Sequence, residues 1–350
     1  MMKRAIVLCA GFVLGWSVDI QAEETDSASH RVYAKPVKRP APVFPASELR
    51  KGRQGWVVLN YVVTDEGEVV EPVVEESSGS GAFERAAISA VKRFEYEPAM
   101  LNGEPVQQCK TKVMISFALE GKEQAVSRPF YARYRRMDTA VNEGDIEKAE
   151  AILNEALEKE SLTNGEISWS WAMKARIAGI RGDKDAQLTA VRRALGSSGK
   201  WIPEELREGL LTTRTVLELE NGDYSSAMDS YSKLEKLQGA EVTTLRPLID
   251  KVNALVDSEQ LFFKAGEIGT NRNCETCESQ WQYRPLRRSV ELAEVDGELG
   301  EVEFRCDWQR YVDNAREGVT WNIPESWGDC AVVVRGQPGS TFKLFEIPAG

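Results

Sequence analysis

The hydrophobic period changes twice along this chain, and this change constrains the fold more than any other feature. Residues 55–63 and 68–76 are rich in β-branched and aromatic side chains. Residues 128–262 instead place apolar side chains at helical spacing, and β-rich runs return after residue 270. The chain has 350 residues, more than one compact core usually spans. The sequence therefore predicts an α+β multidomain protein that is β-rich at both ends and helical between them.

The first β-rich region has the pattern of one small β-β-α-β module. The turn Asp65-Glu66-Gly67 separates the two β-rich runs, which predicts a hairpin. A helical stripe of apolar residues follows: Phe83, Ala87, Ala90, Val91 and Phe94. Residues 113–119 then alternate between apolar and other side chains, as in a half-buried strand. We expect the helix to cover one face of a sheet that these strands form.

Seven short motifs occur in this region in a characteristic order. They are Pro42-Val43-Phe44-Pro45, Gly52-Arg53-Gln54-Gly55-Trp56-Val57, Asp65-Glu66-Gly67, Ser77-Ser78-Gly79, Ala86-Ala87-Ile88, Phe94-Glu95-Tyr96-Glu97-Pro98-Ala99 and Asn102-Gly103-Glu104-Pro105-Val106. Together they resemble the TonB C-terminal domain family over residues 40–121. The resemblance implies a domain that binds the TonB box, a short segment of outer-membrane transporters, as an added strand at a sheet edge. The better-known members transmit energy from an ExbB–ExbD motor in the inner membrane.

The resemblance also indicates which residues contact the partner. The last strand is similar to the receiving edge of the family, and its candidate residues are Lys112, Val113, Met114, Ile115, Ser116 and Phe117. An unpaired edge offers backbone N–H and C=O groups to an extended peptide. We expect Val113, Ile115 and Phe117 to be core residues, with Met114 and Ser116 facing the guest peptide. Phe44-Pro45 stands where the family has Tyr-Pro, and this change removes the hydroxyl group.

Two features depart from the energy transducers of the family. The first is the short connection between the signal region and the domain. Residues 23–39 form a basic linker that contains proline, and the roughly 20 residues after residue 22 reach at most about 65–70 Å when fully extended. About 230 residues follow the domain, which in the namesake ends the chain. Both features leave open a periplasmic scaffold that keeps the binding mode without energy transduction.

The N-terminus has the layout of a secretory signal peptide over residues 1–22. Lys3 and Arg4 precede an apolar run of about 14 residues, and cleavage is expected after Ala22. That run is shorter than the roughly 20 residues that span a bilayer. We therefore expect a periplasmic protein. The alternative is an uncleaved signal anchor in the inner membrane with the rest of the chain on the periplasmic side.

Residues 128–262 contain three similar turns, Glu143-Gly144-Asp145, Arg181-Gly182-Asp183 and Asn221-Gly222-Asp223. Glycine suits the end of one helix and aspartate the cap of the next, so each turn predicts a helical hairpin. The segment resembles an array of about three tetratricopeptide repeats. Arrays of this kind bind peptides in a concave face, but the sequence does not identify the ligand.

Residues 270–350 are predicted to form a small β-rich, sandwich-like domain with four tryptophans and four cysteines. The cysteines are Cys274, Cys277, Cys306 and Cys330. Export favours disulfides, in any of three connectivities. A zinc site with four thiolates is the alternative. The CxxC at residues 274–277 also allows a thiol oxidoreductase, although its polar loop does not resemble a strand-to-helix turn. Cys109 is left without a predicted partner.

Charge and residue usage exclude several functional classes. The net charge is −11, which argues against a nucleic-acid partner. The single histidine, His30, lies outside any patterned segment, so no His-based catalytic centre is expected. We expect no enzyme activity, no cofactor and no metal. The favoured function is a TonB-like adaptor for an outer-membrane transporter or another envelope protein, with an ExbB–ExbD motor as a further candidate partner.

Overall fold

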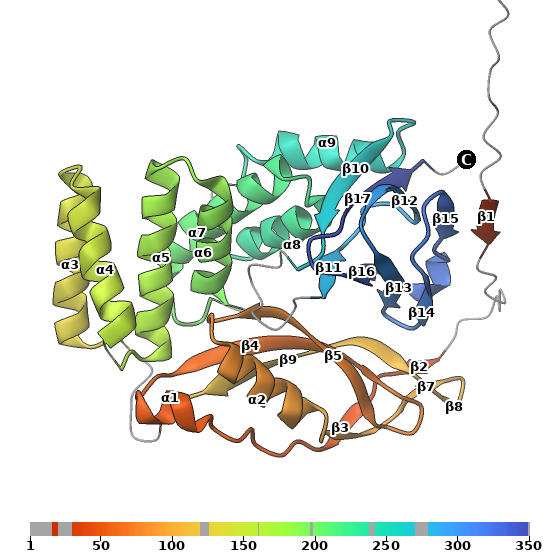
Figure 1. Cartoon of the computed structure of the whole chain (residues 1–350), viewed down its shortest axis with the longest axis horizontal. Helices are drawn as coiled ribbons and strands as arrows, with labels where there is room; N and C mark the ends of the chain where they lie inside the picture. The colour runs from red at the N-terminus through yellow and green to blue at the C-terminus, as the bar shows by residue number, and fades with distance from the viewer. Residues whose placement is uncertain are drawn as a thin grey trace, which may run out of the picture.

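The structure is a computed structural model that describes residues 16–19, 30–119, 126–159, 161–196, 199–237, 242–269 and 279–348. Figure 1 shows three bodies. The N-terminal body (residues 30–119) lies at the bottom of the view in orange and yellow. The helical array (residues 126–256) lies above it in yellow to cyan, and the C-terminal sandwich (residues 262–348) stands beside the array in blue.

The N-terminal body contains the predicted hairpin, helix and last strand. Strands β4 (Gly55–Val63) and β5 (Val69–Ser77) pair antiparallel, and β9 (Gln108–Phe117) pairs antiparallel with the other side of β4. Helix α2 (Gly81–Val91) covers one face of this sheet. All residues of β4 are buried because both faces of the central strand are covered. The last strand begins earlier than the alternation at residues 113–119 predicts.

Several short elements in this body have no counterpart in the sequence-based prediction. They are α1 (Ala46–Arg50), β2 (Arg31–Val32), β3 (Lys35–Lys38), β6 (Glu95–Glu97), β7 (Ala99–Leu101) and β8 (Glu104–Val106). Strand β3 pairs with β6, and β2 pairs with β7. The basic segment predicted as a linker is therefore extended but partly paired within the body. Pro36 fits there because an edge strand tolerates a residue without an N–H group.

Within the described residues, the helical array contains three hairpins, each with a tight turn, followed by a seventh helix. The helices are α3 (Arg128–Asn142), α4 (Ile146–Lys159), α5 (Asn164–Ile180), α6 (Lys184–Leu195), α7 (Glu204–Glu220), α8 (Tyr224–Glu235) and α9 (Arg246–Val256). Gly144, Gly182 and Gly222 have φ of +80°, +72° and +72°, the left-handed conformation that ends a helix. The Asp183 carboxylate then accepts the Ala186 N–H at 2.9 Å and caps α6. These hairpins are consistent with the predicted repeats, and the described residues between 145 and 237 contain no strand.

The C-terminal sandwich consists of two sheets over a shared apolar core. One sheet has the order β1-β15-β12-β17-β10 and the other β11-β16-β13-β14. The strands are β10 (Phe262–Glu267), β11 (Gln280–Tyr283), β12 (Ser289–Asp296), β13 (Leu299–Cys306), β14 (Arg310–Asn314), β15 (Val319–Asn322), β16 (Cys330–Gly336) and β17 (Thr341–Ile347), with a 3₁₀ turn at Glu325–Trp327. Trp281, Phe304 and Trp321 are buried in the core. The sheet thus begins at Phe262, before the predicted boundary at residue 270.

Most of the predicted signal segment lies outside the described residues. The described part, β1 (Trp16–Asp19), pairs parallel with β15 at the end of the sandwich sheet. Across the described ranges, no helix combines the length and the apolar character that a bilayer crossing requires.

The sheet face opposite α2 is covered by the other two bodies. Trp56 of β4 lies against Trp201 in the turn between α6 and α7, with ring centroids 6.5 Å apart. Arg214 of α7 forms an ion pair with Glu76 of β5 at 3.1 Å. From the sandwich, Arg305 of β13 donates to the Glu71 carbonyl at 2.6 Å. The N-terminal body is thus held by contacts that involve both of the bodies that follow it.

Candidate functional site

The predicted partner site lies at one edge of the sheet of the N-terminal body. The strand order is β5-β4-β9, so β9 has β4 as its strand neighbour within the described residues and turns its other side away from the sheet. The register is regular from Gly55↔Phe117 to Tyr61↔Thr111. A regular register lets the direction of each backbone group be worked out residue by residue.

Hydrogen bonds at Trp56 settle that direction. The Ser78 N–H donates to the Trp56 carbonyl at 2.9 Å, and the Trp56 N–H donates to Ser78 Oγ at 3.0 Å. The backbone of Trp56 therefore faces β5, and that of Val57 faces β9. Because Ile115 is opposite Val57, its N–H and C=O face β4.

The same alternation assigns the other residues of β9. Val113 and Phe117 face β4 with their backbone groups, as Ile115 does. The backbone N–H and C=O groups of Lys112, Met114 and Ser116 point toward the outer edge. Met114 already interacts with another residue. The outward positions Lys112 and Ser116 have exposed side chains.

The side chains of β9 divide between two faces. Ile115 and Phe117 are buried under α2, as the alternation predicts, and the Phe117 ring stacks on Phe83 at 4.6 Å. On the opposite face, Ser116 Oγ accepts a hydrogen bond from Asn164 Nδ2 of α5 at 3.1 Å. Lys112 reaches across that face to Glu75 of β5. The β9 edge therefore borders the sheet face opposite α2, where α5 of the helical array contacts Ser116.

Phe44 and Pro45 lie on the helix side of the sheet. The Phe44 ring meets Phe83 and Phe117 edge-on, at 5.6 and 5.8 Å between centroids. Pro45 immediately precedes α1. Through Phe117, the structure brings Phe44 into contact with the side chains of β9, on the face that α2 covers.

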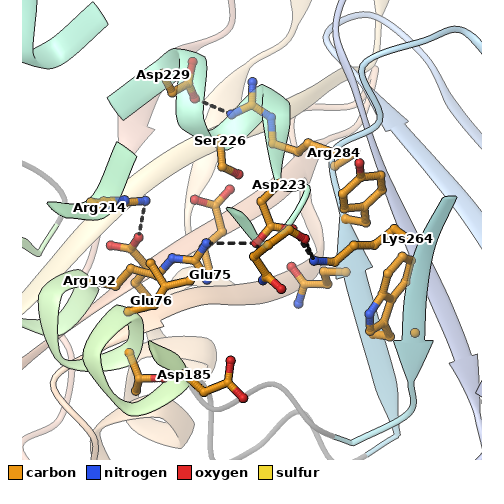
Figure 2. A pocket seen from close by; sticks show the side chains of 18 of the residues that line it. Glu75, Glu76, Asp185, Arg192, Arg214, Asp223, Ser226, Asp229, Lys264 and Arg284 are labelled. Carbon is orange, nitrogen blue, oxygen red and sulfur yellow. Dashed lines mark hydrogen bonds and ion pairs between the residues drawn. The ribbon is translucent and has the colours of Figure 1, made fainter. Parts of the chain in front are cut away.

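A cleft of about 1100 Å³ opens where the three bodies meet (Figure 2). Its floor is the sheet face opposite α2, including Val58, Glu75 and Lys112. Residues of α6 and α8 line it on the side of the array, and residues of β10, β11 and β17 line it on the side of the sandwich. Lys112 belongs both to the β9 edge and to this cleft, so the two features adjoin.

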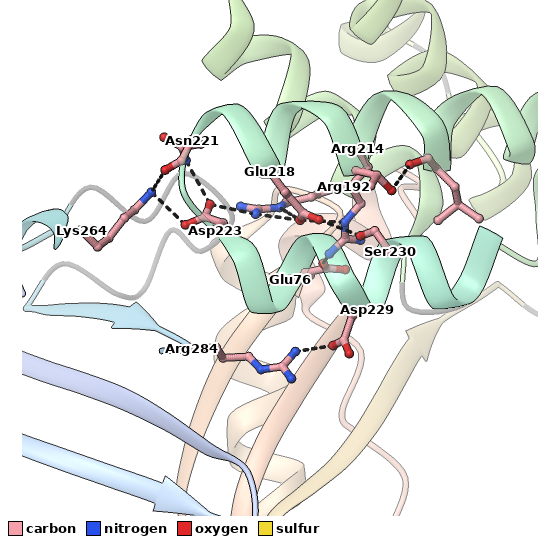
Figure 3. A network of polar contacts seen from close by, with 12 residues as sticks. Glu76, Arg192, Arg214, Glu218, Asn221, Asp223, Asp229, Ser230, Lys264 and Arg284 are labelled. Carbon is pink, nitrogen blue, oxygen red and sulfur yellow. Dashed lines mark hydrogen bonds and ion pairs between the residues drawn. The ribbon is translucent and has the colours of Figure 1, made fainter. Parts of the chain in front are cut away.

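A chain of ion pairs joins the three bodies beside the cleft (Figure 3). Glu218 of α7 accepts hydrogen bonds from Arg192 Nη2 and Arg214 Nε, each at 2.9 Å. Arg214 continues to Glu76 of the N-terminal body. At the other end, Arg192 contacts Asp223 at 3.5 Å, and Asp223 pairs with Lys264 of the sandwich at 2.8 Å.

Glu218 is the centre of this network and is fully buried. Burial by itself raises the pKa of a carboxyl group, but Arg214 and Arg192 outweigh that effect and hold the pKa of Glu218 below its usual range. Sequence reasoning missed the network. Arg192 and Glu218 lie 26 residues apart on different helices, and each alone has the pattern of a charge on a solvated helix face.

The cysteines occupy different environments. Cys306 and Cys330 form a disulfide and lie directly opposite each other on β13 and β16. Cys274 and Cys277 lie outside the described residues. Cys109 on β9 is a free, buried thiol, and burial raises its pKa to about 12, so the thiolate is scarce at neutral pH. No cluster of three or more metal-ligating side chains occurs within the described part of the chain.

Comparison with known proteins gives matches to the N-terminal body. The family described as Gram-negative bacterial TonB protein C-terminal matches residues 40–119. Protein tonB2 of Pseudomonas aeruginosa is 39% identical over 80 residues, which are 23% of this chain and 29% of that protein. Protein TonB of Vibrio cholerae is 27% identical over 110 residues, which are 29% of this chain and 45% of that protein. The chain thus spans less than half the length of either relative.

Among solved structures, the solution NMR structure of the Pseudomonas aeruginosa TonB CTD is 23% identical. The match covers 31% of this chain and 99% of the chain in that structure, with a TM-score of 0.23. The family match at residues 40–119 covers all of the motifs from which the resemblance was predicted. The resemblance is confirmed for that segment, about a quarter of the chain: residues 40–119 match the TonB C-terminal domain family and its relatives.

Proposed function

We propose that this chain is a non-enzymatic, TonB-type adaptor of envelope transport that binds an extended peptide by strand addition along β9. The observation that carries the proposal is the alternation along β9, which turns the backbone of Lys112 and Ser116 outward at the end of the sheet order. An added strand would hydrogen-bond to these groups. Each such bond contributes about 0.5–1.5 kcal/mol net, so several in a row give moderate affinity.

The proposed partner is the TonB box of an outer-membrane transporter, or a comparable extended segment of another envelope protein. This choice rests on the family match at residues 40–119 and on the predicted export of the chain. An ExbB–ExbD motor is a partner only if residues 1–22 remain as an anchor. Cleavage after Ala22 would leave the adaptor in the periplasm without that link.

A second candidate function is a periplasmic scaffold that keeps strand addition without transmitting energy. The observation that favours it is the packing of the N-terminal body against both of the other bodies. Glu76 is tied to the array through Arg214, and Glu71 to the sandwich through Arg305. A transducing domain at the end of a free spacer has no such attachments. In the scaffold reading, the helical array recruits a further protein ligand.

The test is a proline at an outward position of β9. Ser116→Pro removes an N–H that faces the edge, which an edge strand tolerates, whereas Ile115→Pro removes an N–H that faces β4 and should unfold the sheet. Ser116→Ala is the matched control, because it removes the same hydroxyl and keeps the N–H. Binding of fluorescent TonB-box peptides from the transporters of the same genome is followed by anisotropy.

We expect Ser116→Pro to weaken binding about 5- to 10-fold, corresponding to one lost hydrogen bond and a displaced neighbour. Ser116→Ala should bind as the unmodified chain does. Circular dichroism and melting temperature establish that both variants are folded. A folded Ser116→Pro variant with undiminished affinity for every peptide that the unmodified chain binds would exclude the β9 edge as the site.

A further inference from the structure

The cleft between the three bodies is lined by more cationic than anionic side chains, and the ion pairs within it do not include all of the cations. Eight lysine and arginine side chains line it, against seven aspartates and glutamates. Its volume of about 1100 Å³ exceeds the 300–1,000 Å³ of ordinary small-molecule pockets. An extended peptide segment fits a space of this size better than a single small metabolite does.

Each lining carboxylate already has a partner. Glu75 pairs with Lys112, and Glu76 with Arg214. Three more carboxylates form ion pairs: Asp223 with Lys264, Asp229 with Arg284 and Glu294 with Lys343. Asp185 and Glu267 also interact with other residues. A guest cation would therefore have to compete with an existing contact at each of these carboxylates.

Two lining cations are different. Lys233 and Lys236, near the C-terminal end of α8, form no ion pair within the part of the chain that the structure describes, although Glu76 and Asp229 lie close enough to Lys233 to act on its charge. A helix C-terminus stabilises a cation, but that effect does not require both lysines to line the cleft. Burial of the amine, and then the neighbouring Arg214, lower the pKa of Lys233, while Glu76 and Asp229 act in the opposite direction. The negative charge of an incoming carboxylate would favour the charged form of the amine.

The two lysines lie next to the proposed strand-addition edge. Lys233 is close enough to Glu76 and Lys112 to interact with both electrostatically. Lys112 is also the outward-facing residue of β9 that lines the cleft. A peptide that pairs with β9 from Ser116 to Lys112 therefore leaves the edge beside the cleft, within reach of the free cations.

We propose that the cleft binds acidic side chains that flank the strand-forming segment of the guest peptide, with Lys233 and Lys236 as their cationic partners. The proposal rests on strand addition at β9 as the proposed function. The occupant is an acidic peptide segment continuous with the added strand. The cleft selects among partners whose strand-forming segments alone would bind alike.

The experiment uses the mature full-length chain and three peptides. One contains a TonB-box segment alone, one carries Glu-Ser repeats at either end of it, and one carries Gln-Ser repeats instead. The test variant is Lys233→Gln/Lys236→Gln. The matched control is Lys148→Gln/Lys251→Gln, which makes the same change in net charge at two exposed lysines of α4 and α9 that do not line the cleft.

We expect the acidic peptide to bind the unmodified chain more tightly than the other two peptides. The test variant should lose about 3- to 20-fold of that affinity, as expected for two solvent-accessible ion pairs. The loss should shrink in 0.5 M salt. The control variant should bind all three peptides as the unmodified chain does. A photo-crosslinker at Ser226, which lines the cleft, should capture the acidic peptide.

The outcomes separate the two proposals. If the segment alone binds and acidic repeats add nothing, the cleft proposal is overturned and the edge proposal stands. If the acidic peptide binds Ser116→Pro and the unmodified chain equally but loses affinity with the lysine pair, the edge proposal fails and the cleft binds acidic segments by itself. Equal loss in the test and control variants, or no binding of any peptide, overturns the cleft proposal.

Discussion

Replacing Glu218 tests whether the buried ion network holds the array together. Glu218 Oε1 accepts hydrogen bonds from Arg192 and Arg214, and its Oε2 accepts one from Ser230 at 2.7 Å. Glutamine has the same size and can keep one oxygen toward the arginines. Glu218→Gln therefore removes the charge and leaves the packing nearly unchanged.

The magnitude follows from burial. The side chains of Arg192 and Arg214 are 19% and 11% exposed, so their charges are left largely desolvated when the carboxylate is neutralised. Removing one partner of a buried ion pair costs about 3–5 kcal/mol. Because Gln retains an acceptor and the arginines keep some solvent, we expect Glu218→Gln to lower the free energy of unfolding of the array by about 3 kcal/mol. The ion pair from Arg214 to Glu76 remains.

The assay is urea unfolding followed by far-ultraviolet circular dichroism, which reports mainly on the helices. Glu220→Gln is the matched control on the same helix, because Glu220 pairs with Lys184 at the surface and both side chains are about half exposed or more. Such a pair contributes about 0–1 kcal/mol. A Glu218→Gln cost no larger than that of Glu220→Gln would refute the assignment of Glu218 as the centre of the network.

The pH dependence provides a second readout with a definite sign. Opposed by burial, Arg214 and Arg192 still lower the pKa of folded Glu218 below the unfolded value of about 4.3. The stabilisation is therefore fully present above the unfolded-state pKa and is lost as the pH falls through the lower folded-state pKa. The difference between the unmodified chain and Glu218→Gln should be constant at neutral pH and should disappear in strong acid. A difference that persists unchanged there would contradict an electrostatic origin.

Three further predictions concern the cysteines and the N-terminus. Cys306→Ala/Cys330→Ala should lower the free energy of unfolding of the sandwich by about 3 kcal/mol, because the disulfide closes a loop with a sequence separation of 24. Thermal unfolding measures the change, with Cys109→Ala as the control. Cys109 should resist alkylation at pH 8 in the native chain, because its pKa of about 12 leaves little thiolate, and it should react once the chain is denatured. Rapid labelling of the native chain would show instead that the thiol is accessible. Intact mass of the exported protein should place its first residue at Glu23, and retention of residues 1–22 would instead support the anchored form.

Local pattern predicted the elements whose side chains face one core. The hairpin β4–β5 and the helix α2 follow from alternation, a glycine turn and an apolar helical stripe, all of which lie within a few residues of one another. The same alternation places Ile115 and Phe117 in the core and turns Ser116 toward the other face. The short strands β2 and β3 escaped prediction because half of their residues are basic and because they pair only with distant partners.

The pairing of Cys306 with Cys330 shows where local reasoning stops. Spacing along the chain allowed three connectivities, and only the antiparallel register of β13 and β16 places these two residues opposite each other. The cleft is a stronger case, since Lys112, Lys233 and Lys264 come from three different bodies. No periodicity links residues so far apart.

The sequence by itself determined the succession of a β-β-α-β domain, helical hairpins and a β-rich end, because hydrophobic period and turn chemistry act over short stretches of chain. It also predicted the match of residues 40–119 to the TonB C-terminal domain family, because the motifs and their spacing lie within one segment. The tertiary structure alone decided that the far face of the sheet is covered, that Glu218 joins two arginines, and that a cleft adjoins the edge at Lys112. The first and the last of these features depend on how the three bodies pack, through contacts such as Arg214–Glu76 and Arg305–Glu71 that join residues more than a hundred positions apart. The contact of Glu218 with Arg192 depends on the packing of two helices within the array, 26 positions apart.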